Sequence, residues 1–145
     1  MMDRSTRLGR LFAAAVGERG SGAFAGLYES IGRRIHVRRE ELTAAVLREA
    51  LAENGLEERI AEALDDGGFD DAVRQAHQAS QDALGDEAGS PIIAVDGRAF
   101  SGPVLTRKPD KDDSVRLLEA VLTMARIPEF AALQRPYEGP PTIDA

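Results

Sequence analysis

The sequence of 145 residues contains no cysteine and no tryptophan, and aromatic residues make up only 5% of it. Without cysteine, these residues form no disulfide, no thiolate metal site and no cysteine-based redox or nucleophilic centre. No apolar run approaches the roughly 18 residues of a membrane span, and the apolar patch at 11–16 is ended by Glu18 and Arg19. We therefore expect no signal peptide and no membrane contact, and we predict a cytoplasmic protein.

Positive charge is also scarce, because 18 Lys and Arg residues stand against 25 Asp and Glu residues and the net charge is −7. This balance disfavours binding to nucleic acid, which requires a basic surface. We interpret the local run of arginines at 33, 34, 38 and 39 as the solvated end of a helix and the loop after it. The length and the content of 43% hydrophobic and 30% charged residues are typical of about one soluble globular domain.

Apolar residues recur three and four positions apart along most of the chain, which predicts a mainly helical protein. The predicted helices cover residues 6–18, 22–32, 39–53, 56–64, 70–84 and 113–126, and a short final helix runs from Pro128 to Leu133. The periodicity places His77 on the inward face of the helix at 70–84, and it places Val115, Leu118 and Leu122 on the inward face of the helix at 113–126.

The stretch GSPIIAVDGRAFSGPVL at 89–105 departs from this helical pattern and predicts one β-hairpin, with Asp96-Gly97 as its turn. The first strand, Ile92–Val95, is apolar at every position, so we expect cover on both of its faces and a neighbour on each edge. The second strand, at 99–105, supplies one neighbour only. The other edge is open in this sequence, and a partner strand from another chain or a second copy would fill it.

Candidate catalytic or metal-binding clusters are absent from the sequence pattern. The two histidines, His36 and His77, have no partner at metal-ligand spacing, and the paired aspartates are explained as helix caps. We therefore predict no metal site and no catalytic residue. We interpret His77 as a hydrogen-bonded core or ligand-pocket histidine rather than a catalytic one.

Three stretches carry a family resemblance: LYESIGRRIH at 27–36, the segment at 69–105, and EGPPTID at 138–144. Together they resemble the DsbA-like thioredoxin-fold oxidoreductases with a helical insertion, of the actinobacterial mycothiol-dependent nitroreductase type. The resemblance implies a helical insertion domain at 1–86 and a partial thioredoxin-like ββα unit with C-terminal helices at 87–135. Residues 136–145 would then form an extended tail.

The resemblance also implies a ligand-binding surface, with a cis peptide bond at Ser90-Pro91. The site residues carried over are Ser90, Pro91, Phe100, Gly102, Pro103 and His77. From the residues alone, Ser90-Pro91 is a turn at the start of a strand, and the segment from Phe100 to Pro103 is the end of one. Only the resemblance implies mycothiol, or a similar low-molecular-weight thiol, as a cofactor. From the residues themselves we predict no bound cofactor.

The sequence departs from the family at the decisive point, because the strand and helix that carry a Cys-x-x-Cys are missing. In the family this strand lies beside the one matching Ile92–Val95, so the open edge and the missing segment coincide. We expect a truncated chain that is redox-inactive alone and depends on a Cys-x-x-Cys segment that is missing or carried by a separate chain. The alternatives are a non-redox binding or dimerisation module that uses the Ser90-Pro91 surface and the free strand edge, and a remnant without function.

Overall fold

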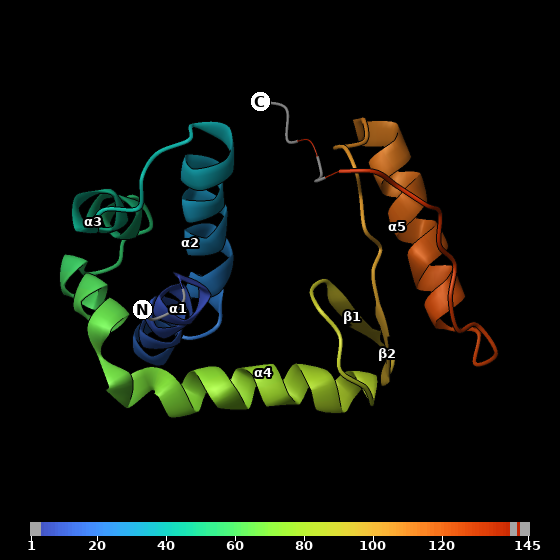
Figure 1. Ribbon diagram of the computed structural model, residues 1–145, viewed down its shortest axis with the longest axis horizontal. Helices are drawn as coiled ribbons and strands as arrows, with labels where there is room; N and C mark the ends of the chain where they lie inside the picture. Colours follow the sequence, from blue (N-terminus) through green and yellow to red (C-terminus); the bar gives the residue numbers. More distant parts are fainter. Residues whose placement is uncertain (1–3, 140–141, 143–145) are drawn as a thin grey trace. The chain divides into compact units, whose positions relative to one another are not determined.

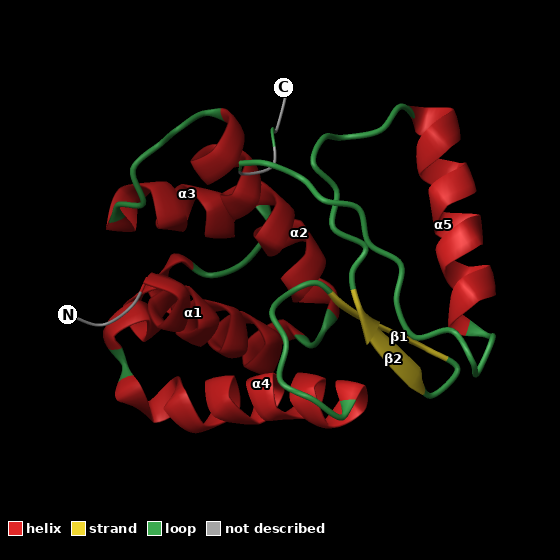
Figure 2. Cartoon of the chain, turned by 45° about the vertical axis from the view of Figure 1, so that its right-hand side comes forward, coloured by secondary structure: helices red, strands yellow, loops and turns green. Residues whose placement is uncertain are grey.

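The structure, a computed structural model, describes residues 4–139 and 142. It is mostly helical and contains one antiparallel β-hairpin (Figures 1 and 2), so the predicted fold class is confirmed. The chain forms two compact units, Met1–Ala76 and His77–Ala145. Helix α4 (Asp70–Leu84) begins in the first unit and ends in the second.

The first unit is a bundle of short helices. Its elements are α1 (Arg4–Arg19), α2 (Gly22–Gly32), the π-helical turn η1 (Arg33–Val37), α3 (Ala44–Glu53), and the 3-10 helices η2 (Glu58–Asp65) and η3 (Gly67–Phe69). Helix α1 contacts both α2 and η2, and α2 also contacts α3.

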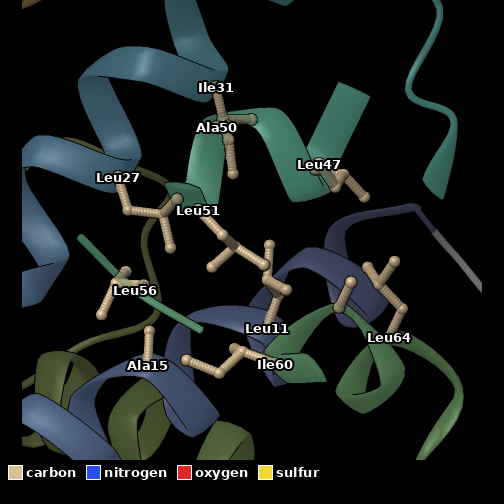
Figure 3. Close-up of a cluster of buried hydrophobic side chains, with 11 residues drawn as sticks. Leu11, Ala15, Leu27, Ile31, Leu47, Ala50, Leu51, Leu56, Ile60 and Leu64 are labelled. Atoms are coloured by element: carbon tan, nitrogen blue, oxygen red, sulfur yellow. The ribbon is translucent and has the colours of Figure 1, made fainter. Parts of the chain in front are cut away.

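An aliphatic core holds this bundle together, and Figure 3 shows its side chains converging from α1, α2, α3 and the η2 region. Four leucines in it are fully buried: Leu11, Leu27, Leu47 and Leu51. Each such side chain contributes about 1.5–3 kcal/mol through removal from water. The core explains why the 3.6-residue periodicity predicted the helices at 6–18 and 22–32.

Two predicted helix boundaries in this unit are wrong. The helix predicted from residue 39 begins only at Ala44, because Arg39 has a left-handed φ of 57° and Thr43 caps the first turn by accepting from Val46 N at 3.3 Å. The predicted helix at 56–64 is a 3-10 helix that starts at Glu58.

The second unit contains the hairpin β1 (Ile92–Val95) and β2 (Arg98–Ser101), with α5 (Lys111–Ala125) packed against both strands. Asp110 caps α5 by accepting from Asp113 N at 2.8 Å. The strand β2 ends at Ser101 rather than at residue 105. It ends there because Gly102 takes a φ of 107° and Pro103 has no N–H to donate.

Two further expectations for this unit are wrong. Residues 127–130 form turns rather than the helix predicted from Pro128, because a segment this short needs packing to stay helical and Leu133 is 78% exposed. The inward face of α5 consists of Val121 and Ala125, whereas Val115 and Leu118 are exposed.

Of the tail at 136–145, residues 140–141 and 143–145 lie outside the described residues, and Thr142 N donates to Thr106 O at 2.9 Å.

Candidate functional site at the end of the hairpin

Two proline dipeptides meet at the end of the hairpin opposite its turn. Gly102 N donates to Pro91 O at 2.8 Å, which places Ser90-Pro91 beside Gly102-Pro103. Both peptide bonds are cis, so the cis bond predicted at Ser90-Pro91 is confirmed. Ser90 and Pro91 are exposed, whereas Gly102 is buried. Four of the six predicted site residues therefore lie together at one end of the sheet.

Phe100 lies two residues before Gly102 on β2, where it pairs with Ile93. Its half-buried ring packs edge-on against Phe130, with ring centroids 6.4 Å apart and an interplanar angle of 89°. This contact holds the segment after α5 against the hairpin, so the side chain of Phe100 serves packing in this unit.

His77 does not lie where the periodicity placed it. The residue is exposed on α4, and the structure describes no buried residue on that helix. The inward placement of His77 is therefore wrong, since α4 keeps only a narrow half-buried stripe that includes Val73 and Leu84. A ligand-binding role for His77 stays a prediction.

The turn end of the hairpin has the geometry that its sequence predicts. Asp96 and Gly97 have φ values of 51° and 79°, as the tight two-residue turn requires. Arg126 Nε donates to Asp96 Oδ2 at 3.1 Å, which ties the end of α5 to this turn. Because both side chains are exposed, this ion pair adds little to the free energy of unfolding.

One edge of β1 has no strand beside it within the residues that the structure describes. Hydrogen-bonded pairs alternate along an antiparallel ladder. Since Pro91 O and Gly102 N form one such pair, Ile93 and Val95 bond to β2, whereas the backbone N–H and C=O groups of Ile92 and Ala94 face the free edge. The expected burial of β1 on both faces is wrong for this chain, because Ala94 is exposed and the other three residues are only half-buried.

Sequence reasoning missed a second polar centre, which lies in the first unit. Arg34 was predicted to be solvated, but it is only 4% exposed. Burial opposes its charge, yet the hydrogen bond to Glu40 and the charges of Glu53, Glu40 and Glu49 keep the pKa of Arg34 above its usual value. Charge patterning alone gives no signal for which arginine of the run turns inward.

Comparison with known proteins identifies the family. Residues 1–135 match the family described as mycothiol-dependent nitroreductase Rv2466c. This chain belongs to the Rv2466c-like family. Over 111 residues the chain is 35% identical to the uncharacterized protein Rv2286c of Mycobacterium tuberculosis, a match that covers 75% of this chain and 47% of that protein. The matched part is thus about half the length of that relative.

The Rv2466c-like chain offers backbone hydrogen-bonding groups at the hairpin but no thiol of its own. The described residues contain no cluster of three or more His, Asp or Glu side chains able to hold a metal ion. No described helix is long and apolar enough to cross a bilayer. A thiol–disulfide step at this site therefore needs a cysteine from outside these residues.

Proposed function

We propose that this chain is the cysteine-free portion of a mycothiol-dependent oxidoreductase, and that it supports a redox centre carried by another segment. Membership of the Rv2466c-like family supports the class of chemistry. The lack of cysteine means that these residues do not themselves cycle between thiol and disulfide. The second segment would be a thioredoxin-like strand and helix bearing a Cys-x-x-Cys, located in the same polypeptide or in a separate chain.

The observation that carries this proposal is the unpaired edge of β1. Ile92 and Ala94 present two N–H and two C=O groups there, directly after the exposed Ser90-Pro91 dipeptide. An extended segment that pairs with this edge would add a strand beside β1, so that β1 lies between it and β2. Cysteines at the end of such a strand would lie near Ser90, and mycothiol would bind at that point.

A proline at position 94 tests this pairing with little damage to the hairpin. Ala94→Pro removes an N–H from the free edge but leaves the bonds between β1 and β2 in place. The matched control is Ala99→Pro, because Ala99 is the partner of Ala94 and faces the opposite edge of the sheet. We expect Ala94→Pro to abolish co-purification of a polypeptide with alkylatable Cys-x-x-Cys thiols and Ala99→Pro to retain it.

The contradicting result is equally plain. If both variants retain the cysteine-bearing polypeptide, the edge of β1 is not its docking site. If the native chain never binds one, the segment is not carried by a separate chain. Circular dichroism of both variants would verify that the hairpin unit is folded.

Self-association through the same edge is the alternative. It is favoured by the absence of cysteine and by the free edge of β1, since two copies could pair antiparallel there without any redox partner. Analytical ultracentrifugation separates the two functions. A concentration-dependent dimer that Ala94→Pro eliminates would support the non-redox module, whereas a monomer at all concentrations would exclude it.

A further inference from the structure

We propose that the first unit binds a phosphate monoester of a small metabolite, in a cavity of about 390 Å³ between α2 and α3. This volume falls within the range of small-molecule sites, which runs from roughly 300 to 1,000 Å³. The inference does not depend on the proposed redox function, because no thiol takes part in it. The lining of the cavity carries three guanidinium groups, Arg33, Arg34 and Arg38, against two carboxylates, Glu29 and Glu53.

A π-helical turn brings two of these arginines to one cavity. Arg38 N donates to Arg33 O at 3.1 Å, so residue 38 lies one turn of η1 after residue 33. In an α-helix, which has 3.6 residues per turn, side chains five positions apart point in different directions. The wider turn therefore allows both guanidinium groups to line the same cavity. Such turns are frequent at functional sites.

One of the two carboxylates of the lining, that of Glu53, is already neutralised. Its Oε1 accepts from Arg34 Nη2 at 2.6 Å, and its Oε2 accepts from Ser30 Oγ at 3.0 Å. Arg34 is itself held in place, since it is buried and its Nη1 also donates to Glu40 and Glu49. Because both oxygens of Glu53 are bound, its charge opposes an anion in the cavity only weakly.

Arg33 and Arg38 are held less firmly than Arg34. Arg33 Nη2 donates to Glu29 Oε1 at 2.6 Å, but the two side chains are 58% and 71% exposed, and an exposed ion pair contributes little. Arg38 Nη1 comes only within 3.5 Å of Glu40 Oε1, which is longer than an ordinary hydrogen bond. This is the one ion pair of Arg38 among the residues that the structure describes. A stronger anion can therefore replace Glu29 at Arg33 and bind Arg38 at little cost.

The chemistry of the two guanidinium groups indicates the class of anion. Each is a planar fork of N–H donors that binds phosphate oxygens bidentately. A phosphate monoester has three terminal oxygens and a charge of about −1.5 to −2 at pH 7, which suits two such forks. A carboxylate has one charge and would satisfy only one of them. In a chain with a net charge of −7, this local excess of guanidinium groups would attract the anion to the cavity.

Titration of the full chain with glycerol 3-phosphate, followed by amide NMR shifts, tests the site. We expect shifts confined to residues 26–38 and 53–54, and none with glycerol. Arg38→Gln should weaken binding by about tenfold, because its charged donors are lost. Arg39→Gln is the matched control, because Arg39 is also exposed and its replacement changes the net charge equally, but it lies outside the lining of the cavity. Its effect on the affinity should be much smaller.

Acetate and inorganic phosphate are titrated in parallel. Acetate that binds as tightly as glycerol 3-phosphate would overturn the choice of phosphate, and inorganic phosphate that does so would overturn the choice of a monoester. The absence of shifts with all probes would overturn the site itself. Equal weakening by Arg38→Gln and Arg39→Gln would also overturn it, since net charge alone would then explain the binding.

Discussion

At the scale of single residues, Arg34 and its neighbour Arg33 have the same side chain in opposite environments. Arg34 is buried with three carboxylate partners, whereas the side chain of Arg33 is 58% exposed and pairs only with Glu29. Replacement of Arg34 removes the hydrogen bonds that a buried guanidinium donates to three partly exposed carboxylates, whereas an exposed ion pair such as Arg33–Glu29 contributes little. The two positions therefore form a natural pair for mutagenesis.

We predict that Arg34→Met lowers the free energy of unfolding by about 2 kcal/mol, because its hydrogen bonds to three carboxylates are lost, whereas Arg33→Met lowers it by less than about 1 kcal/mol. Urea denaturation at pH 7, followed by circular dichroism, measures both. Equal effects at the two positions would show that the network around Arg34 does not stabilise the fold.

The ion pair of Asp70 predicts how the free energy of unfolding depends on pH. The hydrogen bond from Arg10 Nε, at 2.6 Å, holds the pKa of Asp70 below its usual value. A carboxyl group whose folded pKa is depressed stabilises the protein above the unfolded pKa, and this stabilisation is lost as the pH falls through the folded value. Asp70→Asn should therefore destabilise the chain at pH 7, and the difference from the native chain should shrink below about pH 4. Urea midpoints at pH 7 and pH 3 check this, and a constant difference would contradict it.

At the scale of elements, two of the three glycines of α2, Gly26 and Gly32, differ in what surrounds them. A Cβ atom at Gly26 would meet Asn54 Oδ1, whereas one at Gly32, which has a helical φ of −59°, would meet nothing within 4 Å. Gly32→Ala should therefore raise the free energy of unfolding by up to about 1 kcal/mol. Gly26→Ala should gain nothing net, because Asn54 would lose its bond to Ala50 O, worth about 1 kcal/mol.

Thermal unfolding of the two alanine variants measures this difference directly. A higher melting temperature for Gly32→Ala than for Gly26→Ala supports the account of the α2–α3 contact. Equal melting temperatures would mean that Asn54 moves away without loss.

Local signals predicted some elements with their full bounds. The helix at 70–84 and the strand at 92–95 start and end where predicted, because an acidic first turn and an Asp-Gly turn are contained in the sequence itself. The predicted start of α3 and the predicted inward face of α5 were wrong. The first depends on the left-handed φ of Arg39, after which Glu40 N bonds to Arg34 O, and the second on how little of α5 two strands cover. The family resemblance, not the residue pattern, grouped Ser90-Pro91 with Gly102-Pro103, and the pairing of β1 with β2 places the two dipeptides side by side. The burial of Arg34 among three glutamates was not predicted.

At the scale of the whole molecule, the central claim is that this Rv2466c-like chain works with a cysteine-bearing segment at the edge of β1. It rests on the family match over residues 1–135, the lack of cysteine and the two-stranded sheet among the described residues. In the claimed assembly, the exposed Val115 and Leu118 of α5 would lie over the added part of the sheet. The added segment would then bury these two apolar side chains, which are exposed in this chain.

Mass spectrometry of the protein from its own cells, under native and denaturing conditions, tests this claim most directly. The account predicts either a polypeptide longer than the 15.6 kDa of these residues that contains cysteine, or a complex of the 15.6 kDa chain with a Cys-x-x-Cys-bearing chain. Native spectra that show only a 15.6 kDa monomer or homodimer, with no cysteine in the assembly, would contradict it.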